Sequence, residues 1–327
     1  MTKVAINGFG RIGRTFFRTT VEHNAPFEIA AVNNPNWDEK MFKHLLKYDT
    51  VYGRFDGELK AKLLGERESE NLPWKELGIF LVVESTGLFT KREDAQKHLK
   101  AGAKKVVISA PAEEPDITLV PGVNDDEYDP KKHNIISMAS CTTNCLAPVV
   151  KILQENFGVE KGFMTTVHSY TADQNLQDGS HKDLRRARAA AENIVPTKTG
   201  AAKAIFEVVE GLKERMDGMA LRVPTPTVSI IDLVCVTKKK TDAETLNKIF
   251  EKYAKGKMQG ILQVVYEPLV SSDFIKNPHS AILDASLTKV IDGNLVKVVA
   301  WYDNEWGYAT RLVDLAGLII KKEIEKF

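Results

Sequence analysis

The sequence predicts an α/β protein with a Rossmann-type doubly wound parallel sheet, followed by an α+β domain with a mostly antiparallel sheet. Four observations support this. Short β-branched runs alternate with longer helical patterns through the first part of the chain, the pattern typical of βαβ units. A glycine-rich turn follows the first run, and later strands are separated by long stretches. The length of 327 residues suits about two domains.

The first part of the chain contains the expected parallel sheet. Its expected strands span residues 4–7, 29–33, 80–85, 105–109 and 134–139, and its expected helices span 11–23, 39–48 and 91–101. Parallel strands need such crossover helices, which cover the faces of the sheet. A segment with three prolines, 110–122, interrupts the alternation.

The second part has a different pattern. Expected strands at 162–168, 229–237 and 295–301 are far apart in the chain, which favours an antiparallel sheet with helices on one face. We place the domain boundary near Ser140, between residues 1–140 and 141–307. A last periodic segment, 308–320, aligns its apolar residues on one face of a helix, and that face must pack against another part of the protein.

Composition excludes several classes of protein. Lys and Arg number 45 and Asp and Glu 44, so the net charge of +1 makes nucleic acid and anionic membranes unlikely partners. Three cysteines cannot form a disulfide framework, which favours a reducing compartment. No signal peptide and no apolar run of about 20 residues is evident. We expect a cytoplasmic protein without a membrane partner.

The glycine-rich turn contains Gly8, Gly10 and Gly13 in a G-x-G-x-x-G between an expected strand and an expected helix. In that context Gly8 permits the tight turn, Gly10 lets the backbone approach a pyrophosphate, and Gly13 lets helix and strand pack closely. The helix N-terminus adds N–H groups and positive partial charge. The sequence therefore predicts dinucleotide binding rather than a turn without a ligand.

The second strand ends in Asn33-Asn34, where the usual fingerprint has an acid that accepts the ribose 2′-OH. Two interpretations of Asn34 stay open. It caps a turn, or it marks a site that no longer repels a 2′-phosphate.

Cys141 lies where a strand meets an apolar helix. A helix N-terminus lowers the pKa of a thiol, so thiolate is expected near neutral pH. The alternative is an inert core cysteine. Cys145 follows four residues later, a spacing that fits neither a CxxC pair nor a usual zinc knuckle, so no metal site is expected. Cys145 and Cys235 are interpreted as packing residues.

His168 ends a strand, as catalytic groups often do, and is a candidate base for Cys141; a structural histidine is the alternative. Three basic, hydroxyl-rich stretches, 182–188, 197–200 and 221–224, are equally compatible with anion binding and with surface salt bridges.

Taken together, these residues resemble one family, the phosphorylating glyceraldehyde-3-phosphate dehydrogenases. The match extends over nearly the whole chain. It includes INGFGRIGR at 6–14, ASCTTNC at 139–145, HSYT at 168–171 and WYDNEWGY at 301–308.

The resemblance implies that Cys141 attacks the aldehyde of glyceraldehyde 3-phosphate, with His168 as base, and that inorganic phosphate cleaves the resulting thioester. It implies a substrate-phosphate site at Thr171 and Arg222. The attacking phosphate would be held by Ser140, Thr142, Arg186, Thr199 and Gly200. The dinucleotide would be held by Gly8, Gly10, Arg11, Ile12, Gly13, Asn34, Arg67, Ser109 and Asn304. The resemblance further implies a homotetramer whose C-terminal helix, 308–327, docks back on the dinucleotide-binding domain.

Two departures from the family pattern concern the cofactor. The segment between Phe55 and Asn71 is shorter than usual, and it contains Arg67. Asn34, Gly179 and Ser180 resemble the NADP-using photosynthetic members rather than the NAD-preferring ones. We therefore expect NADP, NAD or both as cofactor. The closest rival function is erythrose-4-phosphate dehydrogenase, which hydrolyses its thioester, and a more distant one is a non-catalytic RNA binder.

Overall fold

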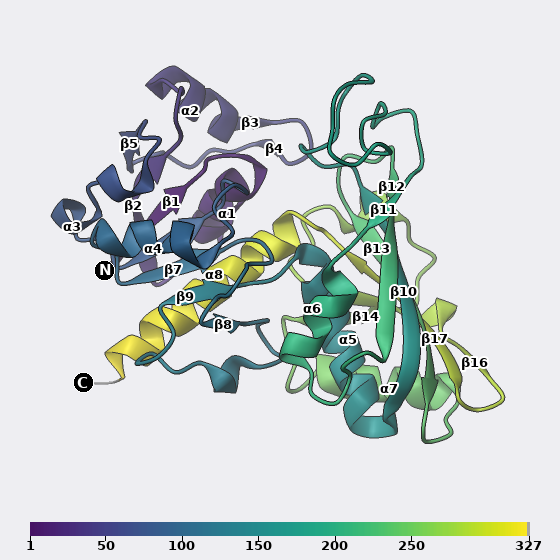
Figure 1. Cartoon of the computed structure of the whole chain (residues 1–327). Coiled ribbons are helices and arrows are strands. Elements are labelled where there is room, and N and C mark those ends of the chain that lie inside the picture. Colours follow the sequence, from purple (N-terminus) through teal and green to yellow (C-terminus); the bar gives the residue numbers. More distant parts are fainter. Residues whose placement is uncertain (326–327) are drawn as a thin grey trace. The chain divides into compact units, whose positions relative to one another are not determined.

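The structure is a computed structural model that describes residues 1–325 (Figure 1). The chain divides into two compact units. The first contains Met1–Ser140 together with the residues from Ala309 onward, and the second is Cys141–Tyr308. The last two residues of the C-terminal helix expected at 308–327 lie outside the described residues.

Within the described residues, the first unit contains a seven-stranded sheet of order β5-β2-β1-β6-β7-β9-β8, and every pair in it is parallel. Its strands are β1 (Thr2–Asn7), β2 (Phe27–Asn33), β5 (Lys62–Leu64), β6 (Leu81–Glu84), β7 (Lys105–Ile108), β8 (Ile117–Thr118) and β9 (Ile135–Ser137). A separate hairpin pairs β3 (Tyr48–Asp49) with β4 (Gly53–Arg54). All residues of β6 and β7 are buried, as expected for parallel strands covered on both faces. The predicted doubly wound sheet is confirmed.

The helices of this unit are α1 (Arg11–Glu22), α2 (Glu39–Lys47), α3 (Trp74–Leu77), α4 (Arg92–Lys100) and most of α8 (Trp306–Ile324). Local chemistry sets their ends. The Asp38 side chain accepts a hydrogen bond from the Met41 backbone N–H and caps α2, and Gly78, with a φ of 67°, ends α3. The helix α1 differs, because its N-cap Gly10 has no side chain to cap it.

The strand order defines where a ligand would bind this unit. The chain runs from β1 outward through β2 to β5, then returns to the other side of β1 and continues through β6 and β7. The switch point therefore lies between β1 and β6. Open α/β sheets bind ligands outside the carboxyl ends of the strands at such a point, and the G-x-G-x-x-G turn directly follows β1.

The short segment between Phe55 and Asn71 forms an edge strand. Its strand β5 pairs in parallel with β2, Asn33 lying opposite Leu64. The segment thus returns to the carboxyl end of β2 despite its length, which places Arg67 just beyond that end.

The second unit is built on an eight-stranded sheet of order β11-β12-β10-β13-β17-β15-β14, with β16 also pairing to β17. The strands are β10 (Val159–Ser169), β11 (Val195–Lys198), β12 (Met216–Val223), β13 (Ser229–Thr237), β14 (Leu262–Val265), β15 (Ala281–Asp284), β16 (Lys289–Ile291) and β17 (Leu295–Tyr302). The pairs β10–β12 and β14–β15 are parallel and the other pairs are antiparallel. The expected mostly antiparallel sheet is confirmed.

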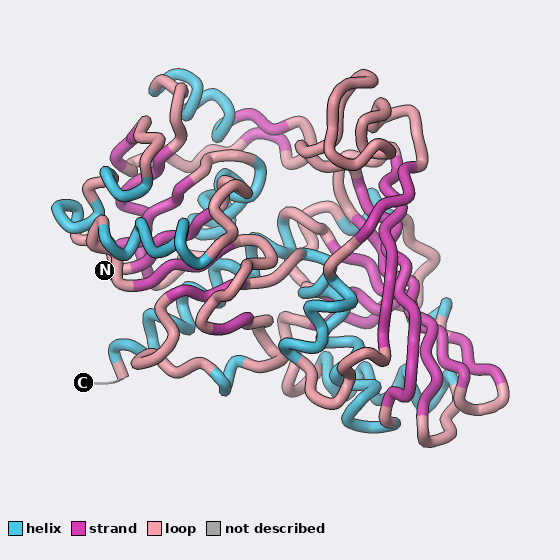
Figure 2. The backbone as a smooth tube through the Cα atoms, viewed as in Figure 1, coloured by secondary structure: helices cyan, strands magenta, loops and turns pink. Residues whose placement is uncertain are grey.

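Three helices belong to this unit: α5 (Cys141–Phe157), α6 (Ala201–Val208) and α7 (Ala243–Ala254). Burial alternates along β13, where Ile231, Leu233 and Cys235 are buried. The opposite face leaves Val234 and Phe163 exposed. The connection 170–194, between β10 and β11, contains no helix or strand and runs as loop (Figure 2).

The C-terminal helix α8 packs on the first unit. Lys322 donates hydrogen bonds to the backbone carbonyls of Asp125 and Tyr128, at 2.9 and 3.2 Å, and its ammonium lies over the Tyr128 ring. Gly317 lies next to Pro26, near the end of α1. The apolar face of this segment, which includes Leu312, is buried.

Candidate active site

Cys141 and His168 face each other in the second unit. Cys141 is the first residue of α5 and is half-buried, whereas His168, near the end of β10, is buried. The Cys141 Sγ lies 3.4 Å from the His168 Nε2. The structure thus brings together the two side chains that the sequence predicted as nucleophile and base.

The backbone orients the imidazole. The Nδ1 of His168 lies 2.7 Å from the carbonyl oxygen of Ser169, and that oxygen also accepts a hydrogen bond from Arg222 Nη1 at 3.0 Å. The carbonyl favours a proton on Nδ1, which leaves the Nε2 lone pair directed at the thiol, whereas Arg222 Nη1, which can only donate and lies 2.8 Å from Nδ1, favours the proton on Nε2. With the proton on Nδ1, His168 can take a proton from Cys141.

Strand register brings Arg222 to the histidine. The parallel pair β10–β12 places His168 opposite Arg222, and Arg222 Nη1 lies 2.8 Å from His168 Nδ1. Burial, and then the positive charge of Arg222, lower the pKa of His168 to about 3. In the absence of a bound anion the imidazole is therefore neutral.

The expectation of a lowered thiol pKa at Cys141 is wrong in its net direction. Burial raises the pKa of Cys141, and the Arg222 charge and hydrogen bonds at Thr142 oppose this rise only in part. Burial also raises the pKa of Cys145 well above its ordinary value and that of Cys235 to about 12. The helix N-terminus lowers the thiol pKa, but at this site desolvation raises it by more. The thiolate therefore forms only with a nearby group that accepts the proton.

Tyr302, which the sequence reasoning did not assign to the site, connects its elements. Its hydroxyl lies 2.9 Å from the hydroxyls of Thr142 on α5 and Thr166 on β10. Its ring meets the His168 ring edge-on, with centroids 6.0 Å apart. Tyr302 therefore fixes the start of α5 relative to the strand that carries His168.

Asn304 follows β17 and is buried. Its Oδ1 accepts hydrogen bonds from the hydroxyls of Ser169, at 3.0 Å, and Ser229, at 2.9 Å. These bonds fix the amide so that its Nδ2 is the group available to a ligand carbonyl. The antiparallel order of β10, β13 and β17 brings the three residues to one edge of the sheet.

The loop after β10 brings together two of the predicted anion-binding residues. Asp173 accepts hydrogen bonds from the Thr171 hydroxyl and from Arg186 Nη1, the latter at 2.7 Å. Arg186 also donates to Thr197 Oγ1 at 3.0 Å. The sequence reasoning missed Asp173, although it lies only two residues after Thr171, the last residue of the HSYT motif.

The other predicted phosphate residues lie at helix starts. Ser140 directly precedes α5, and Thr142 is engaged with Tyr302. Gly200 is the N-cap of α6, and Thr199 Oγ1 accepts a hydrogen bond from the Ala201 N–H at 3.2 Å. In the β11–β12 register Lys198 lies opposite Met219, so Thr199 and Gly200 are not beside Arg222, which lies near the C-terminal end of β12.

In the first unit, the glycine turn has the geometry that a dinucleotide requires. Gly8 has a φ of 95°, and a side chain there would collide with the backbone of Thr86. A side chain at Gly13 would overlap the Gly8 carbonyl oxygen, whereas the space beside Gly10 is open. Arg11 and Ile12 supply the first backbone N–H groups of α1, and no side chain caps this helix N-terminus. These residues fit a pyrophosphate.

The Arg11 side chain is engaged within the protein. It forms an ion pair with Asp49 and lies over the Tyr52 ring at 5.4 Å. Its contribution to a phosphate would therefore come from the backbone N–H.

Three further predicted cofactor residues lie beyond the carboxyl ends of strands β2, β5 and β7 of the parallel sheet. Asn34 follows β2, and its Oδ1 accepts a hydrogen bond from the Phe9 N–H at 2.9 Å. Arg67 donates to Asn36 Oδ1 at 2.8 Å, so its guanidinium lies just beyond Asn34. Ser109 follows β7. Gly179 and Ser180 belong to the loop 170–194 of the second unit, where the Ser180 carbonyl accepts from Asn175.

Comparisons with known proteins identify the family. A sequence model described as glyceraldehyde 3-phosphate dehydrogenase, NAD binding domain, matches residues 2–92, and one described as the C-terminal domain of the same enzyme matches residues 140–304. The chain belongs to the glyceraldehyde-3-phosphate dehydrogenase family. This is a family of NAD-dependent oxidoreductases, so the first unit binds NAD(H).

Similar members of the glyceraldehyde-3-phosphate dehydrogenase family are bacterial. The enzyme of Geobacillus stearothermophilus is 55% identical and covers 98% of each chain. Glyceraldehyde-3-phosphate dehydrogenase 2 of Streptomyces avermitilis is 53% identical over 96% of this chain and 97% of the relative. Glyceraldehyde-3-phosphate dehydrogenase 1 of Bacillus subtilis is 53% identical over 98% of each chain. Among the described residues of this family member, no helix combines the length and apolarity needed to cross a membrane.

Proposed function

We propose that this protein catalyses the reversible, phosphorylating oxidation of glyceraldehyde 3-phosphate to 1,3-bisphosphoglycerate through a thioester on Cys141. The observation that carries the proposal is the Cys141 thiol 3.4 Å from the His168 Nε2, beside the cationic side chain of Arg222. This arrangement joins a nucleophile, its base and a binding group for a phosphate ester.

The first step belongs to Cys141 and His168. Transfer of the thiol proton to Nε2 gives a thiolate and an imidazolium that donates to the sulfur and, through Nδ1, to the Ser169 carbonyl. The sulfur forms a bond to the aldehyde carbon, and the imidazolium returns a proton to the oxygen to give a thiohemiacetal. His168 later takes this hydroxyl proton while the hydride leaves, and the thioester remains on Cys141.

Arg222 and Thr171 hold the substrate phosphate in this proposal. A phosphate dianion next to Arg222 offsets the positive charge that lowers the pKa of His168. Substrate binding therefore makes the imidazole a better proton acceptor when the base is needed. Asp173 orients both Thr171 and Arg186.

The attacking phosphate is assigned to Ser140, Thr142, Arg186, Thr199 and Gly200, on the basis of the family resemblance. One of its oxygens attacks the thioester carbon, and the Cys141 thiolate leaves. The α6 N-terminus at Gly200 supports this assignment, because its N–H groups favour an anion.

NAD supplies the acceptor for the hydride. The chain would hold it through Gly8, Gly10, Arg11, Ile12, Gly13, Asn34, Arg67 and Ser109, with the Asn304 Nδ2 orienting the carboxamide. The uncapped N-terminus of α1 and the engaged Oδ1 of Asn304 support these assignments.

The enzyme also accepts NADP in this proposal. Asn34 lacks the negative charge that would repel a 2′-phosphate. Its Oδ1 accepts from the Phe9 N–H and its Nδ2 donates to the Pro35 carbonyl at 3.4 Å, so the second N–H of Nδ2 can donate to a ligand. The guanidinium of Arg67 lies on neighbouring Asn36 and adds the cation that a phosphate requires. By the family resemblance, Gly179 and Ser180 act from a neighbouring subunit.

We assign a homotetramer in the cytoplasm. The resemblance supplies the oligomeric state, and Phe163, 72% exposed on the outer face of the second sheet, supports burial against another copy. Three free cysteines suit a reducing compartment.

The test is a steady-state assay with glyceraldehyde 3-phosphate and NAD or NADP, with and without inorganic phosphate. Turnover that depends on phosphate or arsenate supports the phosphorylating reaction. A rate unaffected by either anion would contradict it and favour the hydrolytic erythrose-4-phosphate dehydrogenase. Absence of aldehyde oxidation with an intact Cys141 and His168 would favour a non-catalytic binder.

A further inference from the structure

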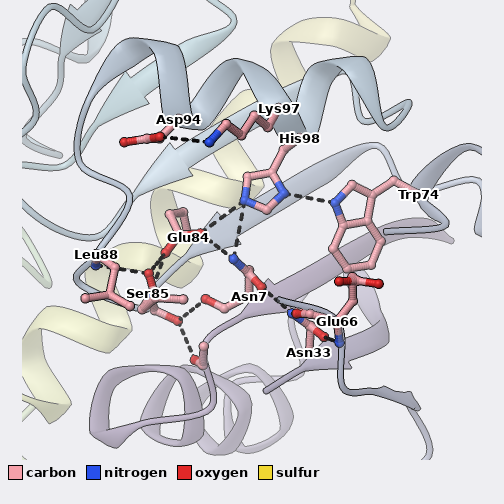
Figure 3. A network of polar contacts seen from close by, with 12 residues as sticks. Asn7, Asn33, Glu66, Trp74, Glu84, Ser85, Leu88, Asp94, Lys97 and His98 are labelled. Atoms are coloured by element: carbon pink, nitrogen blue, oxygen red, sulfur yellow. Dashed lines mark hydrogen bonds and ion pairs between the residues drawn. The ribbon is translucent and has the colours of Figure 1, made fainter. Parts of the chain in front are cut away.

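A chain of buried polar side chains, none of them assigned above to the site, lies at the switch point of the first sheet (Figure 3). Asn7, Asn33 and Glu84 are the last residues of β1, β2 and β6, and each is 2% exposed. Strand register places Asn7 opposite both Asn33 and Glu84. Three polar side chains therefore lie side by side at the edge where the dinucleotide binds.

These side chains bond laterally. Asn7 Nδ2 donates to Glu84 Oε2 at 2.6 Å, and Asn33 Nδ2 donates to Asn7 Oδ1 at 2.7 Å. Asn33 also accepts from the Glu66 N–H and donates to its carbonyl, at 2.9 and 2.8 Å. The chain of bonds thus reaches the residue that precedes Arg67.

The hydrogen-bond partners of His98, which is fully buried on α4, determine which of its ring nitrogens carries the proton. The indole N–H of Trp74 can only donate, and it lies 3.0 Å from His98 Nδ1. Nδ1 must therefore accept, and the proton of the neutral ring lies on Nε2. That N–H donates to Glu84 Oε2 at 3.1 Å, so Asn7 Nδ2, which lies 3.4 Å from the same nitrogen, is a close neighbour of the ring and not its hydrogen-bond partner in this tautomer.

Glu84 is the centre of the chain. Its Oε2 accepts from Asn7 and His98, and its Oε1 accepts from the backbone N–H and the hydroxyl of Thr86, at 2.8 and 2.5 Å. Four donors fill the acceptor positions of an ionised carboxylate. A protonated acid or an amide at this position would place an O–H or N–H donor against one of these four donors.

The same residues hold the loops that meet the cofactor. The Thr86 backbone, fixed by Glu84, lies directly against Gly8. Ser85 donates its hydroxyl to the Gly8 carbonyl at 2.7 Å, and the Gly8 N–H donates to the Asn33 carbonyl at 2.9 Å. Because Gly8 opens the pyrophosphate turn, a displacement of Glu84 or Asn33 would move that turn.

We infer that Asn7, Asn33, Glu84 and His98 form a positioning network that presets the glycine turn, the turn after β6 and the segment around Arg67 for dinucleotide binding. None of these four side chains needs to touch the cofactor. Their role is to remove the cost of ordering three loops at the moment of binding. The inference rests on dinucleotide binding by the first unit and is independent of the chemistry proposed for Cys141.

The experiment moves the negative charge of Glu84 from β6 to position 7 on the neighbouring strand β1, by single and double substitutions. Glu84→Gln leaves an amide N–H₂ facing donors, and Asn7→Asp places two carboxylates against each other. Each single variant should raise the Kd for NAD about tenfold or more, since a buried group loses its partner.

The double variant N7D/E84Q restores the pairing of donors with acceptors. The carboxylate introduced at position 7 can accept from Asn33, from His98 and from the new amide, while the amide oxygen at position 84 still accepts from Thr86. The double variant should therefore bind NAD within about threefold of the parent.

The primary readout is the Kd for NAD by titration calorimetry without substrate, well below the unfolding temperature of every variant. With substrate, the KM for NAD should rise while kcat at saturating NAD stays near that of the parent. The rate of Cys141 alkylation without cofactor should be unchanged, which separates this inference from the proposed reaction. Asp94→Asn is the matched control, because it changes a carboxylate on α4 that bonds to Lys97, at 3.2 Å, away from the network.

The inference is overturned if both single variants bind NAD as the parent does, or if the double variant binds as weakly as they do. Should a single variant not fold, Ser85→Ala probes the same link without a charge change. It removes the bond to Gly8 and should weaken NAD binding severalfold; unchanged binding would equally overturn the inference.

Discussion

At the scale of single residues, the active site depends on how protons are shared between Cys141 and His168. Burial and the Arg222 charge both lower the pKa of His168, which disfavours the imidazolium, and burial raises the pKa of Cys141, which disfavours the thiolate. A thiol and an imidazole 3.4 Å apart can still exchange one proton without separating charge over a long distance. In the proposed function, the geometry of the pair, rather than the acidity of an isolated thiol, supports Cys141 as the nucleophile.

Cys141 should be the single cysteine needed for activity. One equivalent of iodoacetamide per subunit should abolish aldehyde oxidation with the label on Cys141, because Cys145 and Cys235 are buried and have raised pKa values. Peptide mapping of the labelled protein checks this. Substantial activity in Cys141→Ser, or a label on another cysteine, would contradict the assignment.

His168→Asn should slow turnover by roughly 10²–10⁴-fold, the usual scale of general acid–base assistance.

The same variant tests the lowered pKa of His168 through the pH dependence of the free energy of unfolding. With a folded pKa of about 3, against an ordinary 6.5, the unfolded chain binds the extra proton between those values. The stability that His168 contributes is present above pH 6.5 and is lost as pH falls toward 3.

Over that window the parent should lose about 1.4 kcal/mol more of unfolding free energy per pH unit than His168→Asn. Urea unfolding of both proteins at several pH values measures the difference. Parallel pH profiles for the two proteins would show that the histidine is not held neutral by its surroundings.

At the scale of elements, strand register builds both sites. The parallel pairing of β10 with β12 places His168 opposite Arg222, and the pairing of β1 with β2 and β6 aligns Asn7 with Asn33 and Glu84. A shift of one residue would send each of these side chains to the other face of its sheet. The site residues are therefore coupled to the buried apolar residues that set the register.

Arg222→Leu should weaken use of glyceraldehyde 3-phosphate by about a hundredfold or more in kcat/KM, since charge-assisted hydrogen bonds to the phosphate are lost. NAD binding should be unaffected. Because the Arg222 charge lowers the pKa of His168, this variant should also move the histidine titration to higher pH. NMR titration of the imidazole and kinetics with unphosphorylated glyceraldehyde measure the two effects. Equal loss of activity toward both aldehydes would indicate a structural role for Arg222 instead.

At the scale of the whole molecule, the two units separate the two tasks. The first unit, Met1–Ser140 with the residues from Ala309 onward, contains the glycine turn and Ser140, and the second, Cys141–Tyr308, contains Cys141, His168 and the other candidate anion-binding residues. In the proposed function, cofactor choice can therefore change through residues of the first unit, and through Gly179 and Ser180, without altering Cys141 or His168.

Asn34→Asp should shift the ratio of kcat/KM for NADP and NAD toward NAD. The carboxylate would face the 2′-phosphate, and each tenfold change in the ratio corresponds to about 1.4 kcal/mol. Arg67→Ala is the companion variant and should reduce NADP use more than NAD use, because only NADP carries the 2′-phosphate that the guanidinium would bind. A parent that prefers NAD by more than about a hundredfold, roughly 2.7 kcal/mol, would contradict the argument from Asn34.

The sequence alone determined the α/β fold class, and it predicted the dinucleotide turn, Cys141 and His168 from local signals, while the family resemblance supplied Arg222. Glycines at 8, 10 and 13 between a strand and a helix, and a cysteine before an apolar helix, can be interpreted from neighbours in the chain. The expected strands at 4–7, 29–33 and 105–109 correspond closely to β1, β2 and β7 for the same reason.

Only the tertiary structure decided the state and surroundings of those residues. The raised thiol pKa of Cys141 and the lowered pKa of His168 arise from burial and from Arg222, 54 positions away from the histidine in sequence. Tyr302, Asp173 and the network around Glu84 join residues that no spacing rule connects. Burial, strand register and long-range hydrogen bonds form when distant segments pack, so these properties depend on the assembled fold and not on any local pattern.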